Sequence, residues 1–171
     1  MKNPFVAVSL LLTGCLGYHV GPVKPSVLRD IHAIAVPTFA NKTLLPRVEV
    51  LITDSVIKQM QQDGTYRIAT EKDADAILKA EITEISRTPA RSVLGNVLAT
   101  SEFNLAMHVR YKLETPSGTV LMPSAEVVGT TSFFVGTGNN QGDVTTDERQ
   151  ALPLAAEELA TRLVTQLSEG W

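Results

Sequence analysis

The sequence predicts an α+β fold in which two helices pack on one face of a mixed or antiparallel four-stranded sheet, in the order β-α-β-β-β-α. Residues 102–114 alternate apolar and polar side chains, which is typical of an antiparallel strand with one buried and one solvated face. Residues 46–63, and the C-terminal segment from residue 145, instead repeat apolar side chains at helical spacing. Helices before and after a run of three strands are typical of layered α+β domains, so both are expected on the same face.

The composition is that of one globular domain. The 171 residues are 44% hydrophobic and 19% charged, which excludes disorder as the main state. A formal net charge of −3 offers no basic field for nucleic acid. No apolar run reaches the roughly 20 residues that a membrane-spanning helix needs. The single cysteine, Cys15, excludes an internal disulfide and a zinc site built from thiolates.

The N-terminus has the pattern of a secretory signal. Lys2 supplies a positive charge, residues 5–12 form a short apolar run, and the small residues Thr13 and Gly14 precede Cys15. The run is too short to remain as a spanning anchor. Residues 1–14 are therefore predicted to be a signal peptide that is removed from the mature protein.

The tetrapeptide at residues 12–15 resembles the bacterial lipobox, which implies that the Cys15 thiol is acylated and that acyl chains hold the protein at a membrane. In enterobacterial lipoproteins, an aspartate after the acylated cysteine marks retention at the inner membrane. Leu16 at this position therefore implies a periplasmic-side anchor in the outer membrane. A signal peptide with a chance cysteine, or a buried free thiol, is the alternative. Residues 15–30 then form the acylated N-terminus and a tether rich in glycine and proline, and residues 31–171 form a single domain.

The first part of this domain is predicted as strand, turn and helix. Residues 31–36 are apolar and end at Pro37, as in a buried strand, and residues 41–43 form a turn. A helix runs from about Pro46 to Asp63, with Gly64 as its stop. Its core stripe consists of Val48, Leu51, Ile52, Val56 and Met60.

The middle of the domain is predicted as a brief strand at residues 65–69 and a longer one at 76–88. Ile85 breaks the alternation of the longer strand, as a bulge does, and Pro89 ends it. Residues 90–100 are expected to form a loop. The predicted core face of the longer strand consists of Ala76, Leu78, Ala80 and Ile82.

The strand at 102–114 is followed by a hairpin turn at residues 116–118 and a returning strand at 119–135, with Pro123 or Gly129 as candidate interruptions. A glycine-rich loop at 136–142 leads to the last helix. Thr145 and Glu148 of this helix have the spacing of a capping box. Inside the helix, Pro153 predicts a kink or a later start.

The sequence contains no catalytic or metal-binding pattern. The three histidines are His19, His32 and His108. None of them has a second potential ligand at the sequence spacing that is typical of a metal site. The glycines of residues 136–142 lack the βαβ context of a dinucleotide site. Asp73 and Asp75 are predicted to lie in a solvated turn and not in the pocket that acid–base catalysis needs. We therefore predict no enzymatic activity, no metal and no cofactor.

A lipid-binding site is the more specific hypothesis. The segment 90–100 carries four aliphatic residues with Arg87 and Arg91 nearby. Apolar groups beside planar cations suit an amphipathic anionic lipid, whose chains would lie against the aliphatics and whose phosphates would bind the guanidinium groups. The alternative is that this segment folds its aliphatic residues onto the protein's own core.

The order of elements and several segments resemble the LptE family, the lipoprotein partners of the outer-membrane lipopolysaccharide translocon. The resemblance is carried by residues 14–19, 34–43, 49–57, 74–85 and the amphipathic helix from Glu148. It implies a small α+β plug in the lumen of a large β-barrel, where the protein supports barrel assembly, binds lipopolysaccharide and helps deliver it to the cell surface. Arg87 and Arg91 are then the candidate lipopolysaccharide-binding residues.

A lipoprotein activator of a peptidoglycan synthase is the alternative function, because such activators look similar at the opening strand, the turn and the first helix. An activator needs a long tether to cross the periplasm. Residues 16–30 reach only about 50 Å when extended at roughly 3.3–3.6 Å per residue, which favours work at the membrane. A third hypothesis is that the protein is a structural lipoprotein of another kind.

Overall fold

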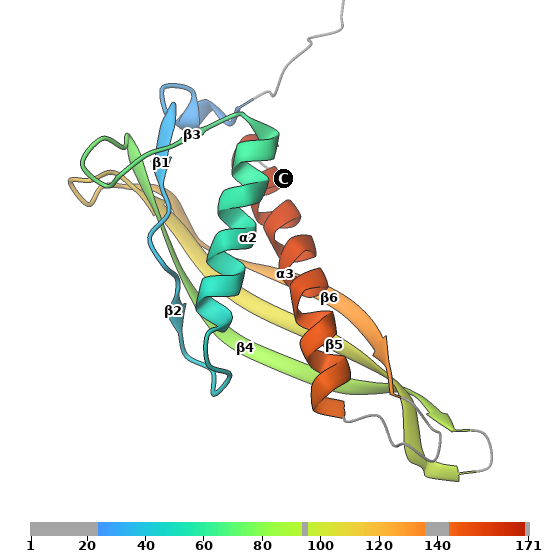
Figure 1. Ribbon diagram of the computed structural model, residues 1–171. Helices are drawn as coiled ribbons and strands as arrows, with labels where there is room; N and C mark the ends of the chain where they lie inside the picture. The colour runs from blue at the N-terminus through green and yellow to red at the C-terminus, as the bar shows by residue number, and fades with distance from the viewer. Residues whose placement is uncertain (1–23, 94–95, 136–143, 170–171) are drawn as a thin grey trace, which may run out of the picture.

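The structure is a computed structural model that describes residues 24–93, 96–135 and 144–169 (Figure 1). The elements in chain order are η2 (Ser26–Leu28), β1 (Ala33–Ala35), β2 (Ala40–Asn41), α2 (Val48–Asp63), β3 (Arg67–Ile68), β4 (Ala76–Val93), β5 (Asn96–Glu114), β6 (Val120–Phe134) and α3 (Val144–Glu169). The predicted α+β class, with two long helices and a mixed sheet, is confirmed. The predicted signal peptide, Cys15 and the glycine-rich loop lie outside the described residues.

The sheet has six strands, so the predicted number of four is wrong. Its order is β3-β1-β4-β5-β6, and β2 pairs with β4 beyond β1. The short strands β1, β2 and β3 pair in parallel, whereas β4, β5 and β6 form antiparallel pairs. β3 lies within the brief strand predicted at residues 65–69, which the count of four left out, and β2 was not predicted. β2 has two residues and is defined by backbone pairing, because so short a segment shows no alternation of side chains.

The β4–β5 hairpin is longer than predicted. β4 continues through Pro89 to Val93, so neither the predicted end at Pro89 nor the predicted loop at 90–100 is correct. Register shifts follow Pro89, and such bulges accommodate a residue that has no N–H to donate to the ladder. An earlier register shift between Ile82 and Glu84 confirms the predicted bulge. The hairpin therefore extends beyond the helices at one end of the molecule (Figure 1).

Both predicted helices are present. α2 ends where expected, because Gly64 adopts the left-handed conformation (φ 73°) and donates its N–H to the carbonyl of Met60. α3 already includes Val144, so the predicted cap at Thr145 is wrong. α3 also runs through Pro153, which excludes a start after that residue.

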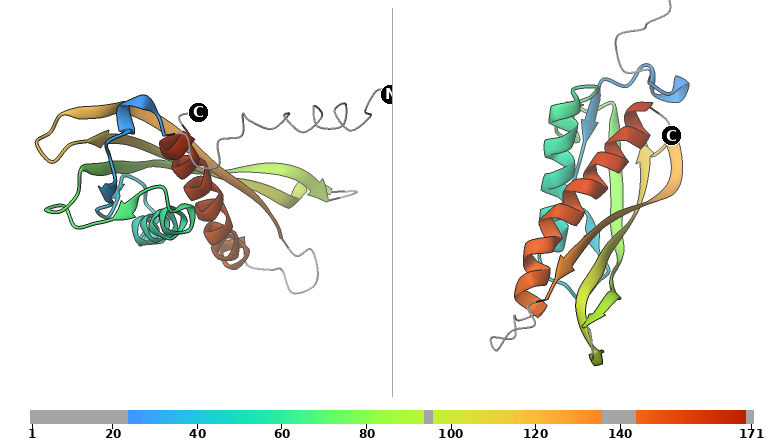
Figure 2. Two further views of the ribbon diagram at one scale, coloured as in Figure 1. Left: turned by 90° about the horizontal axis from the view of Figure 1, so that it is seen from above. Right: turned by 90° about the vertical axis from the view of Figure 1, so that its right-hand side faces the viewer.

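The two helices cover one face of the sheet, as predicted (Figure 2). The core between them includes the fully buried Ile52, Leu78, Leu113 and Leu159. Two buried tyrosines connect the layers. The hydroxyl of Tyr66 donates to the carbonyl of Leu167 over 2.8 Å, and that of Tyr111 donates to Oε1 of Gln166 over 2.6 Å. Burial, reinforced by the charge of Asp63, raises the pKa of Tyr66 to about 12, so its hydroxyl remains a donor across the physiological range.

Side chains hold β2 against α2. Within the predicted turn at 41–43, Oδ1 of Asn41 accepts hydrogen bonds from the N–H and the hydroxyl of Thr43, which confirms the turn. The buried Thr53 of α2 accepts the N–H of Phe39 and donates to the carbonyl of Glu49. These bonds satisfy polar groups that would otherwise be costly to bury.

Candidate functional site

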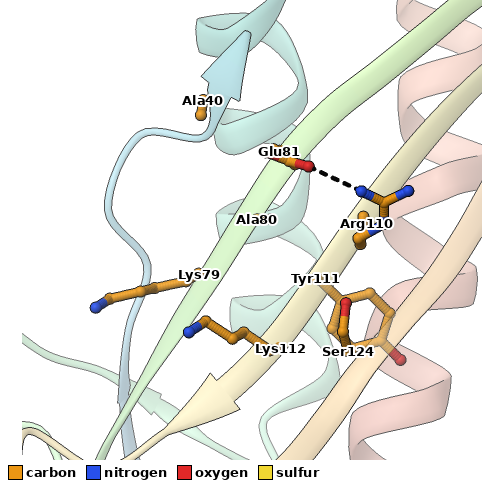
Figure 3. A pocket seen from close by; sticks show the side chains of 8 residues that line it. All are labelled: Ala40, Lys79, Ala80, Glu81, Arg110, Tyr111, Lys112 and Ser124. Carbon is orange, nitrogen blue, oxygen red and sulfur yellow. Dashed lines mark hydrogen bonds and ion pairs between the residues drawn. The ribbon is translucent and has the colours of Figure 1, made fainter. Parts of the chain in front are cut away.

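The sheet face opposite the helices, here called the outer face, is uncovered in the described structure and carries charged side chains (Figures 2 and 3). Alternation along the strands places apolar residues on the helix side and polar residues outside. The outer-face residues that form ion pairs are Lys79, Glu81, His108, Arg110, Lys112, Glu114 and Glu126. This surface is the wet face that the alternation in residues 102–114 predicts.

A shallow hollow of about 260 Å³ lies on the outer face between β2, β4, β5 and β6 (Figure 3). Three of its lining residues are cations: Lys79, Arg110 and Lys112. Each has a carboxylate partner, since Arg110 bonds to Glu81 over 3.1 Å and both lysines bond to Glu114. An incoming anion would have to displace these carboxylates, so the hollow is a solvated surface rather than a prepared anion site.

Glu114 offsets the electrostatic repulsion between two neighbouring lysines of the outer face. Lys79 and Lys112 are direct cross-strand partners, an arrangement that is destabilising for like charges. The carboxylate of Glu114 forms an ion pair with each lysine and is only 6% exposed. Its hydrogen bonds, first to Lys112 and then to Lys79, lower its pKa below the ordinary value. The carboxylate is therefore a structural part of the outer face.

The lowered pKa predicts that Glu114 contributes to acid sensitivity. A carboxyl group whose pKa is depressed on folding stabilises the protein fully above its unfolded pKa, about 4.3, and this contribution is lost as pH falls through the folded value. Urea unfolding between pH 7 and pH 3 should therefore show a smaller loss of stability for Glu114→Gln than for the wild type. Glu71→Gln, at an exposed turn residue, is the control and should retain the wild-type decline. Equal declines in all three proteins would contradict the assignment.

The two predicted lipid-binding arginines lie in the second half of β4, Arg87 beside α3 and Arg91 nearer the end of the strand. Nη1 of Arg87 contacts Oε2 of Glu148 in α3 over 2.7 Å, and Nε of Arg91 lies 3.6 Å from Oε2 of Glu102 in β5. Both side chains are substantially exposed, at 46% and 71%. Each arginine therefore has a carboxylate partner that an anionic ligand would replace or join.

A second basic site, which the sequence did not indicate, lies between the N-terminal ends of α2 and α3. This distal pocket has a volume of about 500 Å³ and is lined by Leu45, Pro46, Arg47, Val48, Leu51, Arg149 and Leu152. Within the described residues, neither guanidinium group has an ion pair or hydrogen bond. Arg47 and Arg149 are about 100 residues apart in the chain, so no local motif relates them.

The backbone at the distal pocket is strained. Arg47 precedes α2 in the left-handed conformation, with φ of 68°, which costs a non-glycine residue about 1 kcal/mol. The preceding Leu44 is fully exposed. Strained backbone conformations are concentrated at functional sites. The pocket combines apolar walls with two planar cations, as an amphipathic anion requires.

Two histidines and an aspartate, considered above for catalysis or metal binding, lie close to neighbouring polar groups. Nδ1 of His32 lies 2.9 Å from the carbonyl of Asp30, and Nδ1 of His108 lies 2.8 Å from Glu126. The carboxylate of Asp75 accepts the N–H groups of His32 and Ala33, each over 2.9 Å, and these bonds lower its pKa. Across the described segments, no group of three or more potential ligands could hold a metal ion. Neither α2 nor α3 combines the length and apolarity of a membrane span.

Solved structures with a similar fold include a dodecamer and two lipoproteins. A PelC dodecamer from Paraburkholderia phytofirmans has a TM-score of 0.53 and 16% identity, over 85% of this chain and 94% of that one. A minor lipoprotein from Acinetobacter baumannii has a TM-score of 0.52 and 16% identity, over 81% and 93%. Lipoprotein B from Nitrosomonas europaea has a TM-score of 0.50 and 14% identity, over 88% and 87%. At these identities the similarity establishes the fold alone.

Family membership rests on the sequence. No curated protein matches the chain at a significant level. The model of the LptE family, described as "Lipopolysaccharide-assembly", matches residues 31–167, which include all the long strands and nearly all of α3. This range agrees with the segments from residue 34 to the last helix that carry the resemblance. The chain therefore belongs to the LptE family of lipopolysaccharide-assembly proteins.

Proposed function

We propose that the protein is an outer-membrane lipoprotein that occupies the lumen of the lipopolysaccharide-translocon β-barrel, aids assembly of that barrel and helps deliver lipopolysaccharide to the cell surface. In this proposal the signal peptide (residues 1–14) is removed and Cys15 carries the acyl chains. Residues 31–171 form the plug. The protein acts by binding and not by catalysis.

The uncovered outer face is the observation that carries the plug proposal. An antiparallel sheet with one solvated face carries polar side chains there, and this face displays cross-strand ion pairs between β4, β5 and β6. The lumen of a large membrane barrel is polar and hydrated. A charged sheet face can therefore lie inside such a lumen without the desolvation that an apolar interface would impose on its charges.

The end of the molecule opposite the N-terminal chain is the proposed lipopolysaccharide contact. This distal end comprises Arg87 and Arg91 of the hairpin together with the distal pocket, and the hairpin and the N-terminal ends of both helices lie there together (Figure 1). Acyl chains would lie in the apolar pocket. Phosphates would bind Arg47 and Arg149 directly, and would share Arg87 and Arg91 with their carboxylate partners.

Affinity purification tests the barrel partner. The tagged lipoprotein, purified from detergent-solubilised outer membrane, is expected to retain a large β-barrel protein, identified by mass spectrometry. Cys15→Ser, which lacks the acylated thiol, is the matched control. It shows whether the barrel protein is recovered only because both proteins are held in the same membrane. Recovery of a peptidoglycan synthase without a barrel would contradict the proposal and support the activator alternative.

Charge reversal tests the lipopolysaccharide contact. Arg87→Asp with Arg91→Asp, and separately Arg47→Asp with Arg149→Asp, should each weaken lipopolysaccharide binding roughly tenfold, since losing about 1.4 kcal/mol of charge-assisted bonding changes affinity by that factor. Binding is measured by titration, with circular dichroism as the check on folding. Lys72→Asp, at an exposed turn away from this end, is the control and should bind normally. Unchanged affinity in either double variant would dismiss that pair.

A further inference from the structure

We propose that the end of the domain from which the N-terminal chain leaves lies directly against the lipid surface that holds acylated Cys15. The inference goes beyond the plug function but rests on its lipid anchor. The contact surface, here called the proximal groove, lies between η2 and the beginning of β6, at the opposite end of the molecule from the distal pocket (Figure 1). Its occupant is the interfacial region of the bilayer.

The proximal groove is apolar and open. It has a volume of about 330 Å³ and is lined by Pro25, Val27, Tyr111, Leu121, Met122, Pro123, Ala125 and Gln166, none of which is charged. Val27 is 60% exposed, and Val120 at the start of β6 is 55% exposed. Exposed apolar side chains that gather around one groove are typical of a surface that meets a partner or a membrane.

The length of the tether favours the membrane as the occupant. The described chain begins at Lys24, directly before the groove residue Pro25, and Cys15 lies nine residues earlier. Nine extended residues span at most about 32 Å. Once acyl chains have entered the bilayer, the groove is held within that distance of the lipid surface, so even a weak contact becomes an intramolecular one.

The charges beside the groove are compatible with lipid headgroups. Arg29 follows η2, is exposed, and has no ion pair or hydrogen bond from its guanidinium group among the described residues. Asp30 is the only carboxylate in residues 24–31. An apolar surface beside a cation is the pattern of interfacial membrane contacts, in which the apolar side chains enter the headgroup boundary and the cation binds phosphate.

Depth-dependent fluorescence quenching tests the contact. The full-length acylated protein, carrying Val27→Cys labelled with an environment-sensitive fluorophore, is reconstituted into vesicles of phosphatidylethanolamine and phosphatidylglycerol. Acylation blocks Cys15, so only the introduced thiol reacts. Leu44→Cys, at a fully exposed apolar residue of the opposite end, is the matched control. Brominated lipids should quench the label at position 27 at least twofold more strongly than the label at position 44.

Flotation separates this inference from the anchor on which it rests. Both labelled proteins should float with the vesicles, and Cys15→Ser should not. Equal quenching at positions 27 and 44 in proteins that float would overturn the contact while leaving the anchor intact. Failure of the acylated proteins to float would overturn the anchor and, with it, this inference.

Discussion

Replacing Gly129 with alanine is expected to destabilise the domain by about 3 kcal/mol, the upper end of the usual range for overpacking. Gly129 lies in β6 where α3 crosses the sheet. A Cβ atom at this position would lie 2.3 Å from the carbonyl oxygen of Ala155, 2.4 Å from Cβ of Leu159 and 2.8 Å from its N atom. These atoms belong to the helix backbone or are fixed to it, so no side-chain rotation relieves the clash. The whole helix must move away from the strand.

Thermal unfolding measures this effect, and a melting temperature lower by roughly 10 °C is expected for a chain of this size. Gly64→Ala is the control for a general cost of losing glycine. Gly64 has a positive φ of 73° but no atom within 4 Å of the position of a Cβ. That substitution should cost only about 1 kcal/mol. A wild-type melting temperature for Gly129→Ala would show that α3 does not pack on β6 as described.

Truncation of Tyr111 to alanine is expected to cost about 3–5 kcal/mol, as for other large buried aromatic residues. The side chain is 2% exposed on the helix side of β5 and is among the largest that are fully buried. Its loss would leave a cavity between the sheet and α3 and would remove the bond to Gln166. Denaturant unfolding should show a lower midpoint.

Tyr111→Phe separates packing from hydrogen bonding. The phenyl ring keeps the packing, and the partly buried Gln166 can bond to water instead, so about 1 kcal/mol is expected. A loss as large as that of the alanine variant would mean that the hydroxyl bond, not the ring, stabilises this contact between the layers.

Much of the fold could be predicted from local pattern. The alternation in residues 102–114 predicts β5, the helical stripe before Gly64 predicts α2, and the irregular parity near Ile85 predicts the bulge in β4. These features depend on residues close together in the chain. The strand continuing past Pro89 did not follow from such a pattern, because the proline is accommodated by pairing with β5.

The candidate site was predicted less completely. Arg87 and Arg91 stand out because aliphatic residues surround them in the sequence, but their carboxylate partners Glu148 and Glu102 come from other elements. Likewise, nothing local relates Arg47 to Arg149, which line the same pocket only because both helices begin at the same end of the sheet.

The sequence by itself determined the α+β class, the resemblance to the LptE family, and the prediction of a lipoprotein signal ending at Cys15, because periodicity and signal motifs are local properties. Only the tertiary structure decided the number of strands, the close approach of Gly129 to α3 and the separation of two apolar surfaces at opposite ends. These features depend on backbone pairing and on contacts between residues far apart in the chain. Such contacts have no signature in any short segment, since each partner's environment is set by the packing of the whole domain.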